Sequence, residues 1–231
     1  MTNTRTLQVA EIFRSIQGES TRAGLPCTFI RLVGCNLRCR WCDTSYAWEG
    51  GSSETLQALL NKVRELPAPL VELTGGEPLL QEGTVGLLTA LLELARSKSS
   101  PLEEVMIETN GSLDIGTVPE GVRRIVDVKC PGSGMSGQML MSNLDVLRAT
   151  DEVKFVIADR ADYDWARDLV RTDRRLERAG AIHFMPVMSA ESPNVSGLRA
   201  RDLADWILAD RLNARLSLQL HKIIWGSDTR R

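Results

Sequence analysis

The sequence has few features that would tie it to a membrane, to nucleic acid or to disorder. None of its apolar runs approaches the ~18 residues that a membrane-spanning helix needs, and its first residues lack the apolar stretch of a signal peptide. The 28 Lys and Arg residues nearly balance the 30 Asp and Glu residues, so no overall basic field attracts nucleic acid or an anionic membrane. Hydrophobic residues make up 43% of the 231 positions, which excludes a largely disordered chain. We expect a globular, cytoplasmic protein without nucleic-acid or membrane partners.

Cysteine is scarce, but three of the five cysteines are crowded into one stretch. The segment GCNLRCRWCDT, residues 34–44, holds Cys35, Cys39 and Cys42. These three lie too close together for independent disulfides, so metal binding is the better interpretation in a reducing compartment. The other two, Cys27 and Cys130, have no such spacing and are expected to be buried as small apolar side chains.

The residue types around the three cysteines favour an iron-sulfur cluster over zinc. Thiolates select both, but a structural zinc site takes four protein ligands. Neither of the two histidines has a cysteine partner at a useful spacing, and Asp43 would need a strained geometry to bind beside Cys42. A 4Fe-4S cluster held by three cysteines leaves one iron open, as a catalytic metal requires. The alternatives are a chance grouping of structural cysteines and a zinc-binding module without enzymatic activity.

Short β-rich runs alternate with amphipathic stretches along the chain. Strands are expected at residues 7–13, 27–33, 70–74, 104–109, 124–129, 152–157, 181–187 and 215–220. Helices are expected at residues 53–66, 83–98, 162–180 and 197–212. This alternation predicts an α/β fold, with a mostly parallel sheet or barrel in a single domain over residues 1–231. Residues 1–6 and 227–231 are candidates for disorder.

Polar segments that contain glycine follow several of the expected strands. The cysteine segment follows the second strand, and later strands are followed by GGEP (75–78), NG (110–111) and CPGSG (130–134). Because ligands in α/β folds bind beyond the C-terminal ends of parallel strands, these segments are expected to converge on one site. Taken alone, GGEP is more simply a turn before a helix.

Together, C-x3-C-x2-C after a strand and the later GGEP resemble the radical S-adenosylmethionine superfamily. A larger set of segments, in one order, is similar to the 7-carboxy-7-deazaguanine synthase family: SIQGES (15–20), FIRLVGCNLRCRWCDTSYA (29–47), LTGGEPLLQ (73–81), ETNG (108–111), DVKCPGSG (127–134), KFVI (154–157) and LQLHKIIWG (218–226). The resemblance covers nearly the whole chain. It implies a partial (β/α) barrel of mostly parallel strands. It also implies a radical-mediated ring contraction of 6-carboxy-5,6,7,8-tetrahydropterin to 7-carboxy-7-deazaguanine, a carbon-nitrogen lyase reaction that releases ammonia in queuosine and 7-deazapurine biosynthesis.

The same resemblance implies the cofactors and partners. The cofactors are a 4Fe-4S cluster with one open iron, S-adenosyl-L-methionine and Mg²⁺. The partners are a small pterin substrate, a flavodoxin- or ferredoxin-type electron donor and a second copy of the chain in a homodimer. A glycyl-radical activating enzyme would share the cysteine segment and the cofactor, but it is not expected to carry SIQGES or the closing LHKIIWG.

The resemblance carries substrate binding to eight positions, namely Ile16, Gln17, Gly18, Glu19, Arg31, Thr74, Gln219 and His221. Gln17 and Glu19 suit the amide edge and the guanidine-like N–H groups of a pterin, although a solvated turn is the plainer interpretation. Arg31 suits the substrate carboxylate, with a buried ion pair, for example to Glu19, as the alternative. Gln219 and His221 are expected on alternate residues of the last strand, where they would close the pocket. A lone histidine is otherwise more often structural.

Binding of S-adenosylmethionine falls by the same resemblance to Trp41, Cys42, Asp43, Gly76, Glu77, Glu108, Asn110, Asp127, Lys129 and Ser133. Glycine at position 76 permits close backbone approach, and Glu77 offers an acceptor for a charged amine. Lys129, expected in an apolar strand, would meet a carboxylate, here that of the methionine. For Trp41 the alternative is a cover that keeps water from the cluster.

Metal binding falls to Cys35, Cys39 and Cys42 for the cluster and to Thr44 for Mg²⁺. A hard cation accepts a neutral hydroxyl oxygen when substrate oxygens and water complete its octahedron. The alternative for Asp43 or Thr44 is a helix cap.

Overall fold

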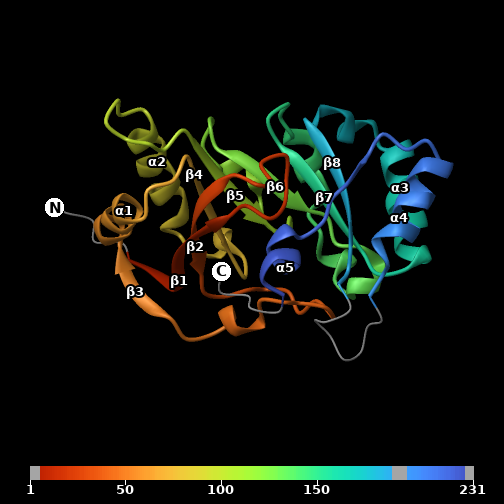
Figure 1. Ribbon diagram of the computed structural model, residues 1–231, viewed down its shortest axis with the longest axis horizontal. Coiled ribbons are helices and arrows are strands. Elements are labelled where there is room, and N and C mark those ends of the chain that lie inside the picture. Colours follow the sequence, from red (N-terminus) through yellow and green to blue (C-terminus); the bar gives the residue numbers. More distant parts are fainter. Residues whose placement is uncertain (1–5, 189–196, 227–231) are drawn as a thin grey trace.

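The computed structural model describes residues 6–188 and 197–226, and the strands in these residues form one nine-stranded sheet (Figure 1). The strands are β1 (Thr6–Ile16), β2 (Pro26–Leu32), β3 (Ser52–Thr55), β4 (Leu70–Gly75), β5 (Glu104–Thr109), β6 (Arg123–Asp127), β7 (Glu152–Ile157), β8 (Ala181–Pro186) and β9 (Arg215–Leu216). Their order in the sheet is β3-β1-β2-β4-β5-β6-β7-β8-β9. The order is linear, so β3 and β9 are the two edges of an open, partial barrel.

The pairings from β2 to β9 are all parallel, and β1 pairs antiparallel with both β2 and β3. Parallel neighbours need long crossover connections. Four of these connections contain the helices α1 (Leu56–Glu65), α2 (Thr84–Ala95), α3 (Arg160–Thr172) and α4 (Ala200–Ala209), and a short helix α5 (Leu220–Trp225) follows β9. The expected α/β fold, a partial barrel of mostly parallel strands, is confirmed.

The two faces of the sheet differ because side chains alternate along each strand. In β4, Val71 and Leu73 pack in a core with residues of α1 and α2, whereas Glu72 and Thr74 line a cavity. In β7, Lys154 is likewise on the cavity side, between residues that pack against α3 and α4. Figure 1 shows α1 with α2 toward one end of the sheet and α3 with α4 toward the other, with α5 between them. The four long helices α1 to α4 pack against one face of the sheet, and the other face is left for a site.

The expected helix at 53–66 begins later than predicted. Residues Ser52–Thr55 form β3 and pair with β1, and the Thr55 side chain then accepts a hydrogen bond from the Ala58 N–H as the N-cap of α1. The residue types at 52–55 do not predict a strand. The strand forms because these residues pair with β1, which lies some fifty residues earlier in the chain. The expected helix at 162–180 is also divided: α3 ends at Thr172, and a 3-10 helix follows at Arg174–Arg178.

The expected strand at 215–220 is wrong in its second half. Only two residues pair with β8, and Gln219 is the N-cap of α5. Gln219 and His221 therefore do not alternate along a strand, but lie at the start of a helix. In a similar way β6 ends at Asp127, so Lys129 lies just beyond the strand.

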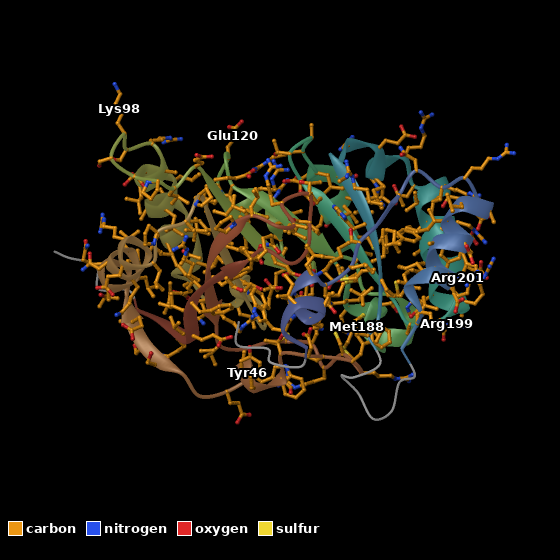
Figure 2. The ribbon with its side chains drawn as sticks, in the orientation of Figure 1. Tyr46, Lys98, Glu120, Met188, Arg199 and Arg201 are labelled. Atoms are coloured by element: carbon orange, nitrogen blue, oxygen red, sulfur yellow. The ribbon has the colours of Figure 1, made fainter. Side chains whose placement is uncertain are left out.

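The described chain begins within the sheet, and charged side chains point outward from its surface. Thr6 already lies in β1, paired with Thr55, so the expected disorder does not extend to it, while residues 1–5 and 227–231 lie outside the described residues. Figure 2 shows Lys98, Glu120 and Arg201 pointing outward from the molecule, as charged side chains normally do. Among the described residues, no helix combines the length and the apolar character that crossing a bilayer requires.

Candidate active site

A cavity lies against the face of the sheet that the long helices leave uncovered. It is lined by the loop after β1, the residues after β2, the inner sides of β4 to β7, and α5. It brings together every site residue predicted from the sequence except Glu77 and Ser133. Segments that are up to two hundred positions apart in the chain therefore meet at one place, as expected for the C-terminal ends of parallel strands.

The cysteine loop, residues 34–44, forms one wall of the cavity. Its ends are held by backbone hydrogen bonds from the Gly34 N–H to the Ala47 oxygen (2.8 Å) and from the Arg40 N–H to the Ser133 oxygen (3.1 Å). The cavity is lined by three free, half-buried thiols, those of Cys35, Cys39 and Cys42. The remaining two cysteines, Cys27 and Cys130, are fully buried elsewhere, which confirms the sequence prediction.

The donor chemistry of the loop fits a thiolate-bound cluster. Burial raises the pKa of the Cys39 and Cys42 thiols, so a cationic metal would displace their protons on binding. Among residues 6–188 and 197–226, no three His, Cys, Asp or Glu side chains are placed to hold one metal ion. A cluster does not need such convergence, because each of the three thiolates binds a different iron.

Gly76 allows the GGEP segment to lie directly against the cysteine loop. A Cβ atom at Gly76 would lie 2.1 Å from the Gly34 oxygen and 2.7 Å from the Cys35 Cβ, far inside any allowed contact. The Glu77 N–H donates to the Gly34 oxygen at 2.7 Å. The strand end of β4 can approach the cluster position this closely only because a side chain is missing at position 76.

Glu77 and Ser133 are the two predicted cofactor-binding residues that do not line the cavity. The Glu77 carboxylate is fully buried and accepts hydrogen bonds from the Leu79 N–H (2.9 Å), the Thr109 hydroxyl (2.9 Å) and the Asn110 N–H (2.7 Å). Its side chain therefore positions the end of β5 and is not turned toward a ligand. The Ser133 hydroxyl, also buried, donates to the Cys130 oxygen at 2.6 Å.

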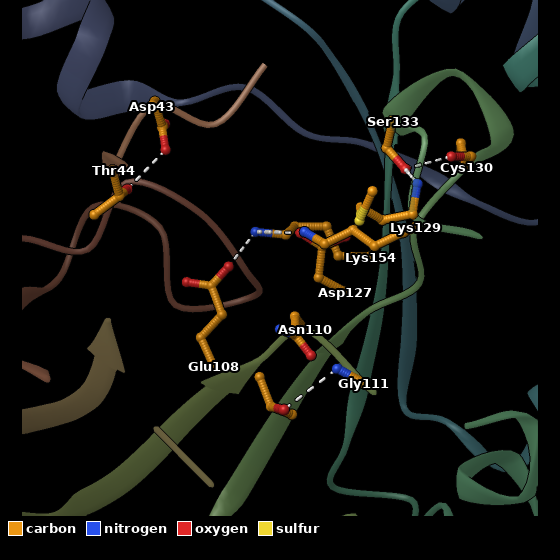
Figure 3. A network of polar contacts seen from close by, with 12 residues as sticks. Asp43, Thr44, Glu108, Asn110, Gly111, Asp127, Lys129, Cys130, Ser133 and Lys154 are labelled. Atoms are coloured by element: carbon orange, nitrogen blue, oxygen red, sulfur yellow. Dashed lines mark hydrogen bonds and ion pairs between the residues drawn. The ribbon is translucent and has the colours of Figure 1, made fainter. Parts of the chain in front are cut away.

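Asp127 and Lys129 form an ion pair on the cavity wall, with Nζ 2.6 Å from Oδ2 (Figure 3). Burial lowers the pKa of Lys129, but the Asp127 carboxylate outweighs it, so the net shift is upward. The other oxygen of Asp127, Oδ1, is buried and has no hydrogen-bond partner within the described residues. A buried unpaired acceptor is costly, so a donor from a ligand is the natural partner for it.

Lys154 is the central charge of the cavity. Its ammonium contacts Glu108, as Figure 3 shows, and lies 2.8 Å from the Glu19 carboxylate. Burial by itself raises the pKa of Glu19, but the ammonium of Lys154 outweighs it and brings the pKa to about 2. Glu19 is therefore ionised at neutral pH, and it is not the solvated turn residue that its local sequence suggests.

The loop after β1 and the start of α5 close the other side of the cavity. The Leu220 N–H donates to the Gly18 oxygen (3.0 Å), and the Gln219 amide donates to Glu19 (2.9 Å). His221 packs directly on Gly18, where a Cβ atom would lie 2.1 Å from the imidazole Nδ1. Although Gln219 is the N-cap of α5 and His221 lies within that helix, not on a strand, both line the cavity as predicted.

Arg31 lies on the cavity wall, paired with a partner that differs from the one expected. Its Nε donates to the Glu11 carboxylate at 2.8 Å, and the Tyr46 hydroxyl donates to the same oxygen at 2.7 Å. The alternative of an ion pair with Glu19 is wrong, because Glu19 pairs with Lys154. The bond to Glu11 uses only Nε of the guanidinium group.

Thr44 and Asp43 place hard oxygen donors at the end of the cysteine loop. The Thr44 hydroxyl donates to Asp43 Oδ1 at 2.8 Å, and Lys222 pairs with Oδ2 of the same carboxylate at 2.7 Å. Thr44 occupies the N-cap position of a 3-10 helix, but its side chain makes no capping hydrogen bond. A single hydroxyl beside a carboxylate fits the sparse protein ligation that Mg²⁺ accepts.

Glu72, Lys154 and Lys222 line the cavity, although the sequence did not single them out. A signal was available for two of them, because Glu72 and Lys154 are charged residues inside the apolar runs LVELT and EVKFVI. Such residues are rarely buried without a partner or a function. Lys222 carries no comparable signal, because a lysine on a short amphipathic helix is ordinary.

Replacing Gly18 with alanine tests how tightly α5 closes the cavity. The added Cβ would overlap the His221 ring, so α5 must shift, and we expect the affinity for the pterin that the family resemblance implies to fall by about tenfold or more. Gly137→Ala is the matched control, because a Cβ there meets nothing within 4 Å. Calorimetry on both variants measures the effect, and unchanged affinity in Gly18→Ala would show that α5 does not contact the ligand.

An open barrel of parallel strands with three cysteines on the loop after its first parallel strand defines an enzyme of the radical S-adenosylmethionine class. A family model described as the Radical SAM superfamily matches residues 29–193. That class implies a 4Fe-4S cluster and S-adenosylmethionine as cofactors, and the thiols and the unpaired Asp127 oxygen are compatible with both.

Comparison with known proteins identifies the family within this class. The chain is 42% identical over 230 residues to a 7-carboxy-7-deazaguanine synthase of Koribacter versatilis, covering 97% of this chain and 99% of that one. It is also 42% identical over 227 residues to a protein of the same name from Chlorobaculum tepidum, covering 97% and 96%. The chain belongs to the 7-carboxy-7-deazaguanine synthase family. The crystal structure of QueE from Escherichia coli has the same fold, with a TM-score of 0.72 at 24% identity, covering 94% of this chain and 95% of that one.

Proposed function

We propose that this protein contracts the ring of 6-carboxy-5,6,7,8-tetrahydropterin to give 7-carboxy-7-deazaguanine and ammonia, within queuosine or 7-deazapurine biosynthesis. The observation that carries the proposal is the shared cavity: the SIQGES loop, the three cysteines and the GGEP strand end all line or adjoin one space. Membership of the 7-carboxy-7-deazaguanine synthase family supports this reaction for the cavity.

Cys35, Cys39 and Cys42 would hold the 4Fe-4S cluster, and S-adenosylmethionine would lie beside it. When bound, the reduced cluster and the cofactor supply the radical that removes a hydrogen atom from the substrate. Lys129 suits the carboxylate of the methionine, and the unpaired oxygen of Asp127 suits a donor group of the same ligand. Trp41, Asp43, Gly76, Glu108 and Asn110 also line the cavity and complete the proposed set.

The pterin would occupy the end of the cavity lined by the loop after β1. There Glu19 is ionised and can accept from the guanidine-like N–H groups of the pterin. Ile16, Gln17, Gly18, Thr74, Gln219 and His221 complete the proposed wall. The bond between the Gln219 amide and Glu19 holds that carboxylate in a fixed orientation.

Mg²⁺ is proposed at Thr44, with substrate oxygens and water as its other ligands. The support is the pair of oxygen donors formed by Thr44 and Asp43. Omitting Mg²⁺ should therefore weaken substrate binding and leave the iron content unchanged.

Arg31 is proposed to bind the substrate carboxylate through its terminal N–H groups. Removing one partner of such a buried charged pair typically costs ~2–5 kcal/mol, so Arg31→Ala should weaken pterin binding by at least about tenfold. Arg31→Lys should restore only part of it, because an ammonium cannot form two parallel hydrogen bonds. Calorimetry on anaerobic protein measures the affinity, with Arg64→Ala on the exposed face of α1 as the control.

A double variant separates this role from the ion pair with Glu11. Arg31→Ala with Glu11→Gln leaves no unpaired carboxylate, so its affinity should stay as low as that of Arg31→Ala. Recovery of wild-type affinity in the double variant would assign Arg31 to the ion pair alone.

Four further features are proposed from the family resemblance. They are a homodimer, a flavodoxin- or ferredoxin-type electron donor, a location in the reducing cytoplasm and a single domain over the whole chain. The single sheet through the described residues supports the last of these, and the free thiols on the cysteine loop suit a reducing compartment.

Product analysis tests the proposed reaction. Reduced, reconstituted protein is incubated with S-adenosylmethionine, Mg²⁺ and the carboxytetrahydropterin, and the products are identified by mass spectrometry. We expect 7-carboxy-7-deazaguanine and ammonia in equal amounts. Cleavage of S-adenosylmethionine without conversion of the pterin would point to another radical reaction.

A further inference from the structure

Glu72 is a carboxyl group buried inside the substrate end of the cavity. It lies on β4, two residues before Thr74 and on the same face, and its side chain is only 2% exposed. The Gln17 amide nitrogen donates a hydrogen bond to its Oε2 atom. The Gln17 oxygen in turn accepts from the Glu19 N–H at 2.8 Å, which fixes the amide with its NH₂ group toward Glu72.

The positive charges of the cavity are already paired with other carboxylates. Lys154 is shared by Glu19 and Glu108, Lys129 pairs with Asp127, and Arg31 pairs with Glu11. Within residues 6–188 and 197–226, no Lys, Arg or His forms an ion pair with Glu72. Its hydrogen-bond partner is a neutral amide, and two other carboxyl groups lie close by. Holding a proton is the ordinary way for a buried carboxyl group without a counter-ion to avoid the cost of its charge.

The groups that face Glu72 from neighbouring elements agree with this. Burial raises its pKa well above the ordinary value of 4.5, and the charges of Glu108 on β5 and Glu19 on the loop after β1 raise it further. Lys154 on β7 and Arg31 on β2 act in the opposite direction without reversing the shift.

Two further titratable groups, the Cys27 thiol beside Glu72 and the His221 ring on the cavity wall, bring no charge. Burial raises the pKa of Cys27 on β2, so this thiol stays neutral. Burial lowers the pKa of His221 on α5, and for a histidine this shift also favours the neutral form.

We propose that Glu72 is a specificity-determining residue that binds the lactam edge of the pterin as a neutral carboxylic acid, accepting from the ring N–H and donating its O–H to the ring carbonyl oxygen. An ionised carboxylate can only accept, whereas a protonated one both donates and accepts. Glu19 and Glu72 lie in one cavity but differ in protonation, so they read different edges of the same heterocycle. This inference rests on the proposed function, because it specifies how that substrate is recognised.

Two substitutions at position 72 separate the neutral acid from a merely structural group. Glu72→Gln keeps a donor and an acceptor without charge, so we expect the KM for the pterin to stay within about threefold of wild type. Glu72→Val removes both groups and leaves the lactam edge unpaired, so its KM should rise by about tenfold or more while bound iron is unchanged. Glu93→Gln on the exposed side of α2 is the matched control.

The pH dependence gives a second readout. Wild-type affinity should fall as the pH is raised from about 6 to about 10, because ionised Glu72 cannot donate and is repelled by Glu19 and Glu108. Glu72→Gln should lack this fall. If the fall persists in Glu72→Gln, another group is titrating and the proposal is wrong.

Infrared spectroscopy tests the proton without turnover. The protein should show a carboxylic-acid C=O band at neutral pH that is absent from Glu72→Gln, and an unchanged spectrum would overturn the proposal. Failure of the proposed function looks different, since the wild type itself would then make no deazaguanine. If the wild type turns over but Glu72→Gln loses as much affinity as Glu72→Val, only the role of Glu72 is wrong.

Discussion

Replacing Cys35, Cys39 or Cys42 with alanine is expected to remove bound iron and to abolish S-adenosylmethionine cleavage. A cluster retained by only two thiolates leaves two irons exposed to solvent, so it should be lost rather than weakened. The measurements are iron and sulfide content and the visible absorbance of anaerobically reconstituted protein, none of which depends on turnover.

The two buried cysteines provide matched controls. Cys27 and Cys130 do not line the cavity and are 0% and 1% exposed, so Cys27→Ala and Cys130→Ala should keep the brown chromophore. A modest loss of stability from the small voids is expected in both. If Cys130→Ala lost the cluster while Cys39→Ala kept it, the ligand assignment would be wrong.

Lys154→Met is expected to lower the free energy of unfolding by ~3–5 kcal/mol, the usual cost of removing one partner of a buried ion pair. The Lys154 side chain is only 7% exposed and pairs with both Glu19 and Glu108, so its loss leaves two partly buried carboxyl groups without a counter-charge. Urea unfolding monitored by tryptophan fluorescence measures the change. Lys62→Met is the control, because its ion pair with Glu65 is exposed to solvent and should contribute little to the free energy of unfolding.

The pH dependence of stability identifies the carboxylate involved. Folding lowers the pKa of Glu19 from 4.5 to about 2, so the stabilisation from its pairing is complete above pH 4.5 and is lost as the pH falls toward 2. Lys154→Met should lack this component, and its stability should change less than that of the wild type across the same interval. An equal acid dependence in the two proteins would show that Lys154 does not stabilise the ionised form of Glu19.

The sequence located the parts of the site whose chemistry is local. Three thiols within eight residues predict a metal site without any knowledge of the fold, and the alternation of strands and helices correctly predicted that loops after parallel strands would meet. Gly76 belongs to the same group, because a glycine at a strand end already suggests a close approach of two backbones. The sequence does not show which segment Gly76 approaches, and the structure identifies this segment as Gly34 and Cys35.

The roles that the sequence did not predict depend on contacts with residues that are distant in the chain. Lys154 pairs with Glu19, 135 positions away, and Gln17 bonds to Glu72, 55 positions away. Glu77 was assigned to the cofactor because its acceptor chemistry suits an amine, but Thr109 and the Asn110 N–H, more than thirty positions away, already satisfy that acceptor. Residue type indicates what a group can bind, whereas the fold decides which partner reaches it first.

An anaerobic crystal structure of the reconstituted protein with S-adenosylmethionine and the carboxytetrahydropterin tests most directly whether one cavity holds both ligands. We expect the cluster on Cys35, Cys39 and Cys42, with the methionine group of the cofactor near Asp127 and Lys129. The pterin ring should lie against Glu19 and Glu72, with its carboxylate on Arg31. A pterin bound outside this cavity, or a cluster held by other residues, would contradict the proposed site and the function inferred from it.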